Sequence, residues 1–166
     1  MANGPYRILF VCMGNICRSP AGECVLRATA QAEGMGERIE CDSAGTIGYH
    51  AGNSPDARMR KAAKARGISV EGAARQFHAG DFSDFDLILT MDDDNFADIE
   101  RGRGGQDGKA VVRRFCEFVT EHEAEEVPDP YYGGAAGFEH VLDLLEDGCA
   151  EIVRRIKENK DVGNSA

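Results

Sequence analysis

YRILFVCMGNICRSP, at residues 6–20, passes directly from an almost continuous apolar run into the start of a helix. The run Tyr6–Cys12 is typical of a short strand that is buried on both faces, as strands of parallel sheets are. Pro20 suits the first turn of a helix, because the N–H that a proline lacks would have no partner there. A buried strand that leads into a helix predicts an α/β fold, in which ligands bind beyond the carboxyl ends of the strands.

The rest of the chain continues this alternation. The later strands are expected at residues 39–41, ending near 43–46, at 86–91 and, more weakly, at 111–119. The helices are expected from Ser19 and Pro20 to 32, from 54–56 to about 67, from the acidic residues 92–94 onward, and at 138–156. The last is the clearest, since its apolar residues recur at spacings of three, four and seven. Such alternation implies right-handed crossovers and a parallel sheet covered on both faces.

Composition limits the classes of protein that this chain can belong to. Its 166 residues suit one domain, and 42% hydrophobic residues support a folded core. A net charge of −10 argues against a nucleic-acid or membrane partner, because both reward clustered Lys and Arg. We therefore expect a single domain over residues 1–166, with residues 1–5 and 161–166 frayed and a flexible loop at 102–108.

The cysteines and the N-terminus indicate the compartment. The first seven residues lack the apolar segment of a signal peptide, and no apolar stretch is long enough to cross a bilayer. Six cysteines in a chain of this size, without an export signal, indicate reduced thiols rather than a disulfide framework. A cytoplasmic location is expected.

The loop after the first strand has the features of a phosphate site. Gly14 and Asn15 tolerate left-handed backbone angles, so the turn can aim successive N–H groups at an anion. The following helix adds its positive end. Arg18 can grip two phosphate oxygens, and the same positive field stabilises a thiolate at Cys12. Ser19 is placed to donate a further hydrogen bond to that thiolate.

The backbone groups expected to bind phosphate belong to Met13, Gly14, Asn15, Ile16, Cys17 and Arg18. A cysteine that ends a buried strand is more often an inert small hydrophobe than a nucleophile. The spacing from Cys12 to Arg18, with Gly–Asn between them, favours the nucleophile here.

The segment VCMGNICRSP, at residues 11–20, resembles the phosphate-loop signature of low-molecular-weight protein tyrosine phosphatases. Three further motifs follow in the family's order: SAGT at 43–46, TMDDDN at 90–95 and DPYY at 129–132. The resemblance implies a three-layer α/β fold, with a four-stranded parallel sheet between helices. It also implies that Cys12 is the nucleophile, Arg18 the phosphate clamp and Asp129 the general acid.

An enzyme of this kind hydrolyses phosphotyrosine and other aryl phosphates through a cysteinyl phosphate, and it needs no metal or cofactor. The four histidines of this chain, at 50, 78, 122 and 140, show no paired metal-ligand spacing. Phosphate and other oxyanions are the expected inhibitors, and the oligomeric state is expected to be a monomer or a weak homodimer.

Asp129 lies between Pro128 and Pro130, and each proline favours an extended backbone before it, which stiffens the loop. Asp-Pro alone more often marks an exposed turn. Tyr131, Tyr132 and the earlier Tyr49 are expected to form aromatic walls that favour aryl phosphates. Packing of these tyrosines against the loop is the alternative.

Other residues are expected to support the site. In relatives, an asparagine like Asn15 and a serine like Ser43 shape the loop through hydrogen bonds, and Asp92 resembles a position near the loop. Helix capping explains Asp92 equally well. Cys17 lies within the loop, and a Cys12–Cys17 disulfide would protect the nucleophile from irreversible oxidation. Simple packing explains Cys17 equally well.

Three alternatives remain. Arsenate reductases share this loop but use further cysteines near the third strand, and residues 76–95 contain none. Protein-arginine phosphatases have Thr where this chain has Ile16, which favours phosphotyrosine. A phosphate-binding module without turnover is disfavoured by the presence of both Cys12 and Asp129. The acidic surface gives weak support to a substrate with basic residues beside its phosphotyrosine.

Overall fold

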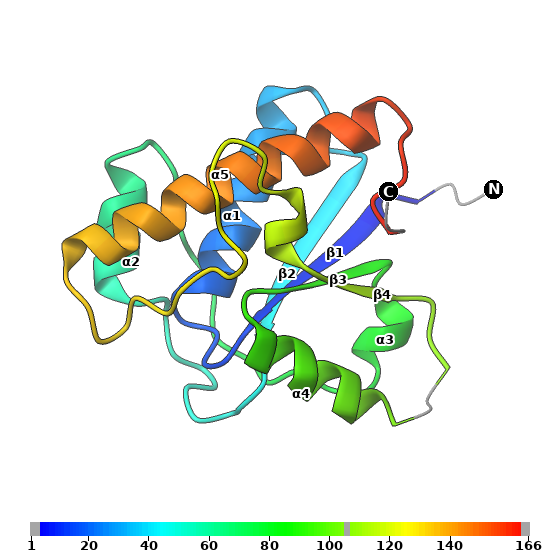
Figure 1. The fold of residues 1–166 in the computed structure, drawn as a ribbon, viewed down its shortest axis with the longest axis horizontal. Helices are drawn as coiled ribbons and strands as arrows, with labels where there is room; N and C mark the ends of the chain where they lie inside the picture. The colour runs from blue at the N-terminus through cyan, green and yellow to red at the C-terminus, as the bar shows by residue number, and fades with distance from the viewer. Residues whose placement is uncertain (1–3, 105–106, 164–166) are drawn as a thin grey trace.

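A parallel sheet in the order β2-β1-β3-β4 organises this computed structural model, which describes residues 4–104 and 107–163 (Figure 1). The strands are β1 (Tyr6–Cys12), β2 (Ile39–Gly45), β3 (Leu87–Thr90) and β4 (Val111–Arg114). β1 lies in the centre, where Val11 pairs with Ala44 on one side and Thr90 on the other. The carboxyl ends of these strands therefore meet at one edge of the sheet, as expected for a parallel α/β fold.

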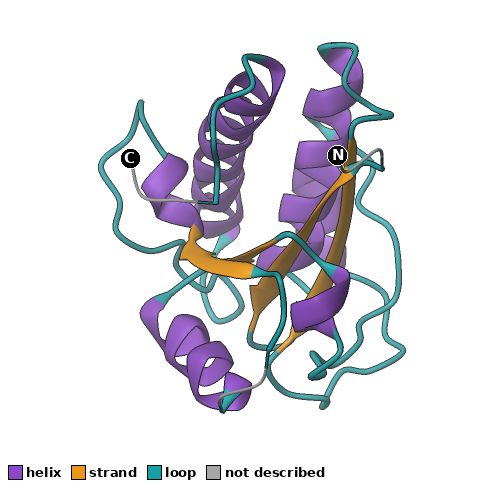
Figure 2. Ribbon diagram, turned by 90° about the vertical axis from the view of Figure 1, so that its right-hand side faces the viewer, coloured by secondary structure: helices purple, strands orange, loops and turns teal. Residues whose placement is uncertain are grey.

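Helices cover both faces of the sheet (Figures 1 and 2). The helices are α1 (Arg18–Ala32), α2 (Ala57–Lys64), α3 (Asp81–Asp84), α4 (Asp93–Arg103) and α5 (Ala135–Lys157), and the short 3₁₀ helix is η1 (Phe115–Phe118). β1 shows why two layers are needed. Ile8 and Phe10 belong to the core beneath α1 and α5, whereas Leu9 and Val11 belong to a smaller core with Phe82. Alternate side chains of one strand thus fill opposite layers.

Two aspartates fix the starts of helices near the carboxyl edge of the sheet. The Asp56 side chain caps α2 by accepting from the backbone N–H of Arg58 at 2.8 Å. The Asp92 side chain caps α4 in the same way, accepting from the N–H of Asn95 at 2.8 Å. Such caps satisfy N–H groups that have no partner within the helix.

The four predicted strands and four of the helices are confirmed, with differences at their ends. The prediction of a strand across 111–119 is wrong after Arg114, because residues 115–118 form η1. Phe115 and Phe118 are both fully buried, and this 3₁₀ turn directs them into the core beside α5. Helix α3 was not predicted, because its four residues are too few to show a periodic pattern.

The predicted frayed ends are only partly tested. Val162 is 3% exposed and its carbonyl accepts from the Arg113 guanidinium at 3.0 Å, so residues 161–163 are not frayed. Residues 1–3 and 164–166 lie outside the described part, as do residues 105–106 of the loop predicted at 102–108. In that loop α4 continues to Arg103 and ends on the left-handed Gly104. Across the described residues, no helix has the length and apolar character that crossing a membrane requires.

Candidate active site

A cavity of about 60 Å³ lies beyond the carboxyl end of β1. It is lined by Cys12, Met13, Gly14, Ile16, Cys17, Arg18, His50, Asp129, Tyr131 and Tyr132. Segments far apart in the sequence therefore meet at the edge where the fold predicts a ligand site. The three residues expected to carry the chemistry, Cys12, Arg18 and Asp129, all belong to this lining.

The backbone between β1 and α1 is held from outside the loop. The carbonyl of Cys12 accepts from Thr46 N at 2.9 Å, that of Met13 from Ile47 N at 3.1 Å, and that of Ile16 from Asp56 N at 2.8 Å. In the described part of the chain, by contrast, none of the N–H groups of residues 13–17 donates to a protein acceptor. Carbonyls turned outward and unpaired N–H groups are what an anion-binding nest requires.

Asn15 holds the sharpest bend of the loop. Its φ is 58°, in the left-handed region, and the residue is 2% exposed. Its side-chain oxygen accepts from the N–H of Arg75 at 2.9 Å, and its Nδ2 donates to Ser19 Oγ at 2.8 Å. The predicted role of Asn15 in shaping the loop is thus consistent with its geometry, although it lies behind the cavity lining.

Ser19 lies directly behind the cysteine. The distance between Cys12 Sγ and Ser19 Oγ is 3.0 Å, and both residues are buried. The Ser19 hydroxyl accepts from Asn15, and its single proton has two acceptors within reach, the Ala44 carbonyl at 3.4 Å and, closer, the Cys12 sulfur at 3.0 Å. A hydrogen bond of this kind stabilises a thiolate.

Arg18 connects the loop to the opposite wall of the cavity. Its NH1 donates to Asp92 Oδ2 at 2.5 Å and to the Val127 carbonyl at 3.0 Å, while its NH2 lies 3.8 Å from Asp129 Oδ2. Burial acts to lower the pKa of Arg18, but the Cys12 sulfur and the two carboxylates raise it above its usual value. A permanent cation is therefore fixed at the base of the cavity.

Asp92 both caps a helix and contacts the phosphate loop, the two roles that the sequence left open. One oxygen caps α4 and the other holds Arg18. It does not line the cavity, so its effect on a bound anion passes through Arg18.

Asp129 lies on an exposed loop, with its side chain 36% exposed. Its Oδ1 accepts from the N–H of Tyr131 at 3.0 Å, which forms a local turn. On either side of it, Val127 N donates to the Met91 carbonyl at 2.7 Å and Gly133 N donates to the Pro130 carbonyl at 3.0 Å. The carboxyl therefore belongs to the cavity lining and is carried by a segment with backbone hydrogen bonds on both sides.

Cys17 lines the same cavity as Cys12, and its side chain is buried. Burial raises the pKa of the Cys17 thiol well above its usual value, and the Asp56 carboxylate adds to this effect. Cys17 is therefore a protonated thiol at neutral pH. Within the described residues, no three His, Cys, Asp or Glu side chains come together to form a metal-binding group.

Two of the predicted positions differ from expectation. Tyr49 is 84% exposed and does not line the cavity, although Tyr131 and Tyr132 do. Ser43 was expected to shape the loop, but its hydroxyl donates to Glu23 Oε1 at 2.8 Å. β2 carries Ser43 alongside Phe10, which is two residues before the loop begins.

His50 is a lining residue that the sequence analysis missed. Its ring packs edge-on against Tyr49, with 4.8 Å between ring centroids, and lies 6.3 Å from the Tyr131 ring. A Cβ at Gly14 would lie 3.0 Å from the His50 ring, so the glycine leaves room for the histidine. The segment 46–53 is an irregular loop without periodicity, and only the proximity of His50 to Tyr49 in sequence could have drawn attention to it.

Comparison with known proteins agrees with this geometry. Residues 7–162 match the family described as low molecular weight phosphotyrosine protein phosphatase. A relative from Synechocystis sp. is 51% identical over 147 residues, which are 89% of this chain and 94% of the relative.

Solved structures give the same result. A protein tyrosine phosphatase from Entamoeba histolytica superposes with a TM-score of 0.87 at 42% identity, covering 93% of this chain and 98% of that one. A Drosophila arginine phosphatase superposes with a TM-score of 0.85 at 28% identity, covering 90% of this chain and 97% of that one. The match across almost the whole chain shows that this protein belongs to the low molecular weight phosphotyrosine protein phosphatase family.

Proposed function

We propose that the protein hydrolyses phosphotyrosine in proteins in two steps, with Cys12 as nucleophile and Asp129 as acid and then base. The observation that carries this proposal is the loop of residues 13–17, whose N–H groups have no protein acceptor in the described structure. Met13, Gly14, Ile16 and Cys17 of this loop line the same cavity as Cys12 and the buried Arg18. This arrangement suits three phosphoryl oxygens whose charge must be stabilised during transfer.

In the first step, the Cys12 thiolate attacks phosphorus and forms the S–P bond. The bond from phosphorus to the tyrosine oxygen breaks, and Asp129 donates its proton to the departing phenolate. Asp129 faces the cavity at its rim, where a leaving group in line with the cysteine would depart. The products are a cysteinyl phosphate on Cys12, a dephosphorylated tyrosine side chain in the substrate and an ionised Asp129.

In the second step, water attacks the cysteinyl phosphate and gives one proton to Asp129. The S–P bond breaks, inorganic phosphate forms and the thiolate of Cys12 is regenerated. Ser19, at 3.0 Å from the sulfur, stabilises the thiolate as a leaving group. Asp92 acts as a positioning residue for Arg18.

The choice of an aryl ester is supported by the side chains around the opening. Tyr131, Tyr132 and the imidazole of His50 provide flat surfaces, and Ile16 adds an apolar one. Such a rim stabilises a phenyl ring and offers little to an alkyl phosphate such as phosphoserine.

A phosphoarginine substrate is the second candidate, because an arginine phosphatase has nearly the same fold. Fold similarity does not separate the two activities. Ile16 favours phosphotyrosine, since it cannot hydrogen-bond to a guanidinium as a threonine could.

Three further features belong to this proposal. The family match over residues 7–162 supports a single phosphatase domain. Cys17, buried in the cavity lining, supports a protective Cys12–Cys17 disulfide. A cytoplasmic location and the monomer or weak homodimer rest on the sequence alone.

The test compares the hydrolysis of phosphotyrosine, phosphoarginine and phosphoserine in peptides of otherwise identical sequence. We expect metal-independent release of phosphate from phosphotyrosine, abolished in Cys12→Ser and strongly slowed in Asp129→Asn. Faster turnover of the phosphoarginine peptide would show that phosphoarginine, and not phosphotyrosine, is the preferred substrate. Undiminished activity in Cys12→Ser would refute the mechanism.

A further inference from the structure

Helix α2 carries a charge opposite to that of the protein as a whole. Residues 57–66 contain five cations and no acid, in a chain whose net charge is −10. The cations are Arg58, Arg60, Lys61, Lys64 and Arg66. A basic face on an acidic protein indicates a local interaction that the overall charge does not describe.

Two of these cations are already paired. Arg58 contacts Asp56 at 2.9 Å, and Arg66 lies 2.8 Å from Glu139 and 3.0 Å from Asp143 on α5. Arg60, Lys61 and Lys64 are exposed, and none of them forms an ion pair with any residue in the ranges 4–104 and 107–163. Arg60 Nε donates to the Pro55 carbonyl at 3.1 Å, and Arg60 and Lys64 line a hollow that also contains Glu71. The outer face of α2 therefore presents three cations without an ion pair, of which Lys61 and Lys64 also have no hydrogen bond from their side chains in the described structure.

This face adjoins the active site. The N–H of Asp56, the cap of α2, donates to the Ile16 carbonyl of the phosphate loop at 2.8 Å. The Arg58 guanidinium lies 5.4 Å from the Tyr131 ring centroid and 4.8 Å from that of Phe138. Arg58 also lines a groove of about 360 Å³ together with Lys61, Phe138 and Glu139, and the charge of Glu139 is paired with Arg66. A chain that leaves the cavity past Tyr131 would enter this groove.

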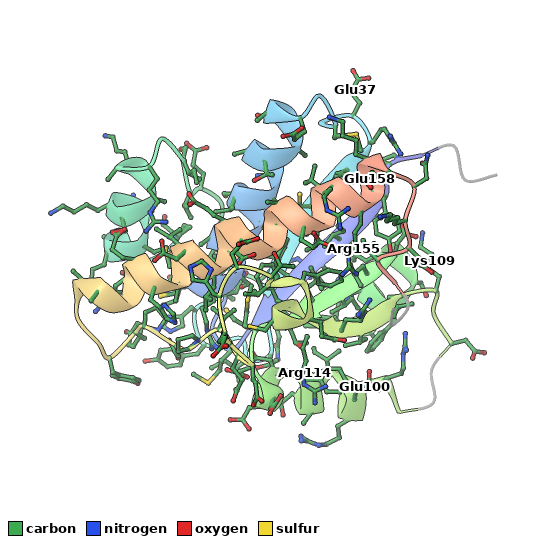
Figure 3. The ribbon with its side chains drawn as sticks, turned by 45° about the horizontal axis from the view of Figure 1, so that its top comes forward. Glu37, Glu100, Lys109, Arg114, Arg155 and Glu158 are labelled. Atoms are coloured by element: carbon green, nitrogen blue, oxygen red, sulfur yellow. The ribbon has the colours of Figure 1, made fainter. Side chains whose placement is uncertain are left out.

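The opposite side of the site is acidic. Figure 1 shows α2 and α4 on different sides of the loop that follows β1. Near the start of α4, Asp93 is paired with Arg114, whose side chain lies beside that helix in Figure 3. The exposed Asp94, Glu123 and Glu125 have no ion pair within the described structure. Acidic residues of a substrate would be repelled on this side and attracted on the other.

We infer that the physiological substrate carries acidic residues beside its phosphotyrosine and lays them along α2, over Arg60, Lys61 and Lys64. This inference rests on the proposed function and adds the class of substrate. It replaces the weakly supported expectation of a basic-flanked target, which followed from the net charge. At physiological ionic strength charges are screened beyond about 8 Å, so the cations that touch the substrate outweigh more distant acids.

The experiment uses three phosphotyrosine peptides. One has three aspartates on the N-terminal side of the phosphotyrosine, and one has them on the C-terminal side. The third has asparagine in place of the aspartates. The variant is Lys61→Gln/Lys64→Gln. Its matched control is Lys157→Gln/Lys160→Gln, which removes the same charge at the far end of α5. A small aryl phosphate, too short to reach α2, reports the basal activity of each enzyme.

We expect kcat/KM for one of the two acidic peptides to exceed that for the asparagine peptide. The α2 variant should lower that value about threefold to tenfold, mainly through KM, as two exposed ion pairs would. This loss should shrink as salt is raised. The control variant should lower it less than about twofold. Turnover of the aryl phosphate and of the asparagine peptide should be unchanged in both variants.

Equal kinetics of acidic and asparagine peptides, or equal losses in the α2 and control variants, would overturn the inference. Two results for the α2 variant would also overturn the inference, if its peptide kinetics are unchanged. Loss of binding to phosphatidylserine vesicles would assign the basic face to a membrane surface, and loss of self-association in sedimentation would assign it to a second copy of the chain. Peptide affinity for Cys12→Ser, measured by fluorescence anisotropy, keeps the test independent of turnover. If no phosphotyrosine peptide is hydrolysed, the proposed function fails, while these affinities still decide whether α2 binds acidic segments.

Discussion

The loop of residues 12–18 and the loop of residues 128–134 face each other across the cavity but are held in different ways. In the first, buried side chains at Asn15 and Ser19 form a connected network, and three carbonyls accept hydrogen bonds from other segments. In the second, Asp129 makes a local turn with Tyr131 and a 3.8 Å contact with Arg18, and few other hydrogen bonds hold the loop.

This difference corresponds to two kinds of task. An anion receptor works best when its donors are already in place, because no free energy is then lost in reorienting them. A proton donor at the rim must also allow the substrate to enter and the phosphate to leave. We therefore expect substitutions in the first loop to change both stability and activity, and substitutions in the second to change activity with only a small change in stability.

The largest effect is expected from Cys12→Ser, which removes the nucleophile and leaves the network behind it in place. Turnover of phosphotyrosine should fall by at least about 10⁴-fold, the order seen when other covalent nucleophiles are removed. Binding of inorganic phosphate, measured by calorimetry, should persist because the N–H groups and Arg18 remain. Loss of phosphate binding together with turnover would mean that the sulfur is part of the receptor.

Asp129→Asn should come next, lowering kcat by about 10²–10⁴-fold because the leaving group receives no proton. The loss should be smallest for an aryl phosphate whose phenol is acidic and departs unaided. Thermal denaturation should show an unchanged melting temperature, since the side chain has only one local hydrogen bond and a 3.8 Å contact with Arg18. A large fall in stability would contradict the division of tasks between the loops.

Asn15→Ala should lower the free energy of unfolding by roughly 2–4 kcal/mol, from the left-handed backbone and the lost hydrogen bonds. Asn15→Gly keeps the backbone permissive and should recover part of this loss, but not the hydrogen bonds to Arg75 and Ser19. Pro130→Ala in the second loop should cost only about 1 kcal/mol. Chemical denaturation measures the free energy of unfolding of all three variants. Equal losses of stability at Asn15 and Pro130 would contradict the difference between the two loops.

Cys17→Ser tests whether the first loop also protects its nucleophile. Peroxide oxidises Cys12 to a sulfenic acid, and the Cys17 thiol can condense with it to form a disulfide and water. Activity recovered by a thiol reductant should fall at least about twofold in Cys17→Ser but not in Cys24→Ser, a buried cysteine outside the cavity lining. Full recovery in Cys17→Ser would assign that cysteine to packing.

The smallest effect is expected at the rim. Tyr132 is 90% exposed and touches the Tyr131 ring edge-on at 4.9 Å, so Tyr132→Ala removes little contact. We expect KM for phosphotyrosine peptides to rise less than about threefold, with kcat unchanged. Steady-state kinetics measures both constants. A rise in KM well above about threefold would contradict this prediction and show that Tyr132 is an essential part of the substrate site.

The chemistry-bearing loop was predictable from sequence because its parts are close together along the chain. Cys12, the Gly14-Asn15 turn, Arg18 and Ser19 lie within eight residues, so strand and helix patterns alone place them at one edge of the sheet. Asp129 was placed by resemblance to a family, since no local pattern joins it to Cys12. The strand Leu87–Thr90 was predictable for the same local reason: its side chains are all buried.

The missed features depend on contacts between distant segments. His50 enters the cavity because the irregular loop after β2 folds back over Gly14, and an irregular loop has no period to detect. Ser43 turns to Glu23 because α1 passes over β2, which no sequence spacing reveals. The expectation of a substrate with basic flanking residues rested on net charge, which averages over a surface on which α2 and α4 differ in sign.

The buried Val162 has a consequence for solubility. Val162 belongs to the core cluster beside the sheet, and apolar surface of this kind promotes association with other chains when it is exposed. Arg113 on β4 donates to the Val162 carbonyl, and a Cβ on Gly163 would lie 3.5 Å from the Val111 side chain. The last described residues therefore cover apolar surface on one face of the sheet, and a protein shortened before Asp161 should remain catalytic yet precipitate at concentrations that the full chain tolerates.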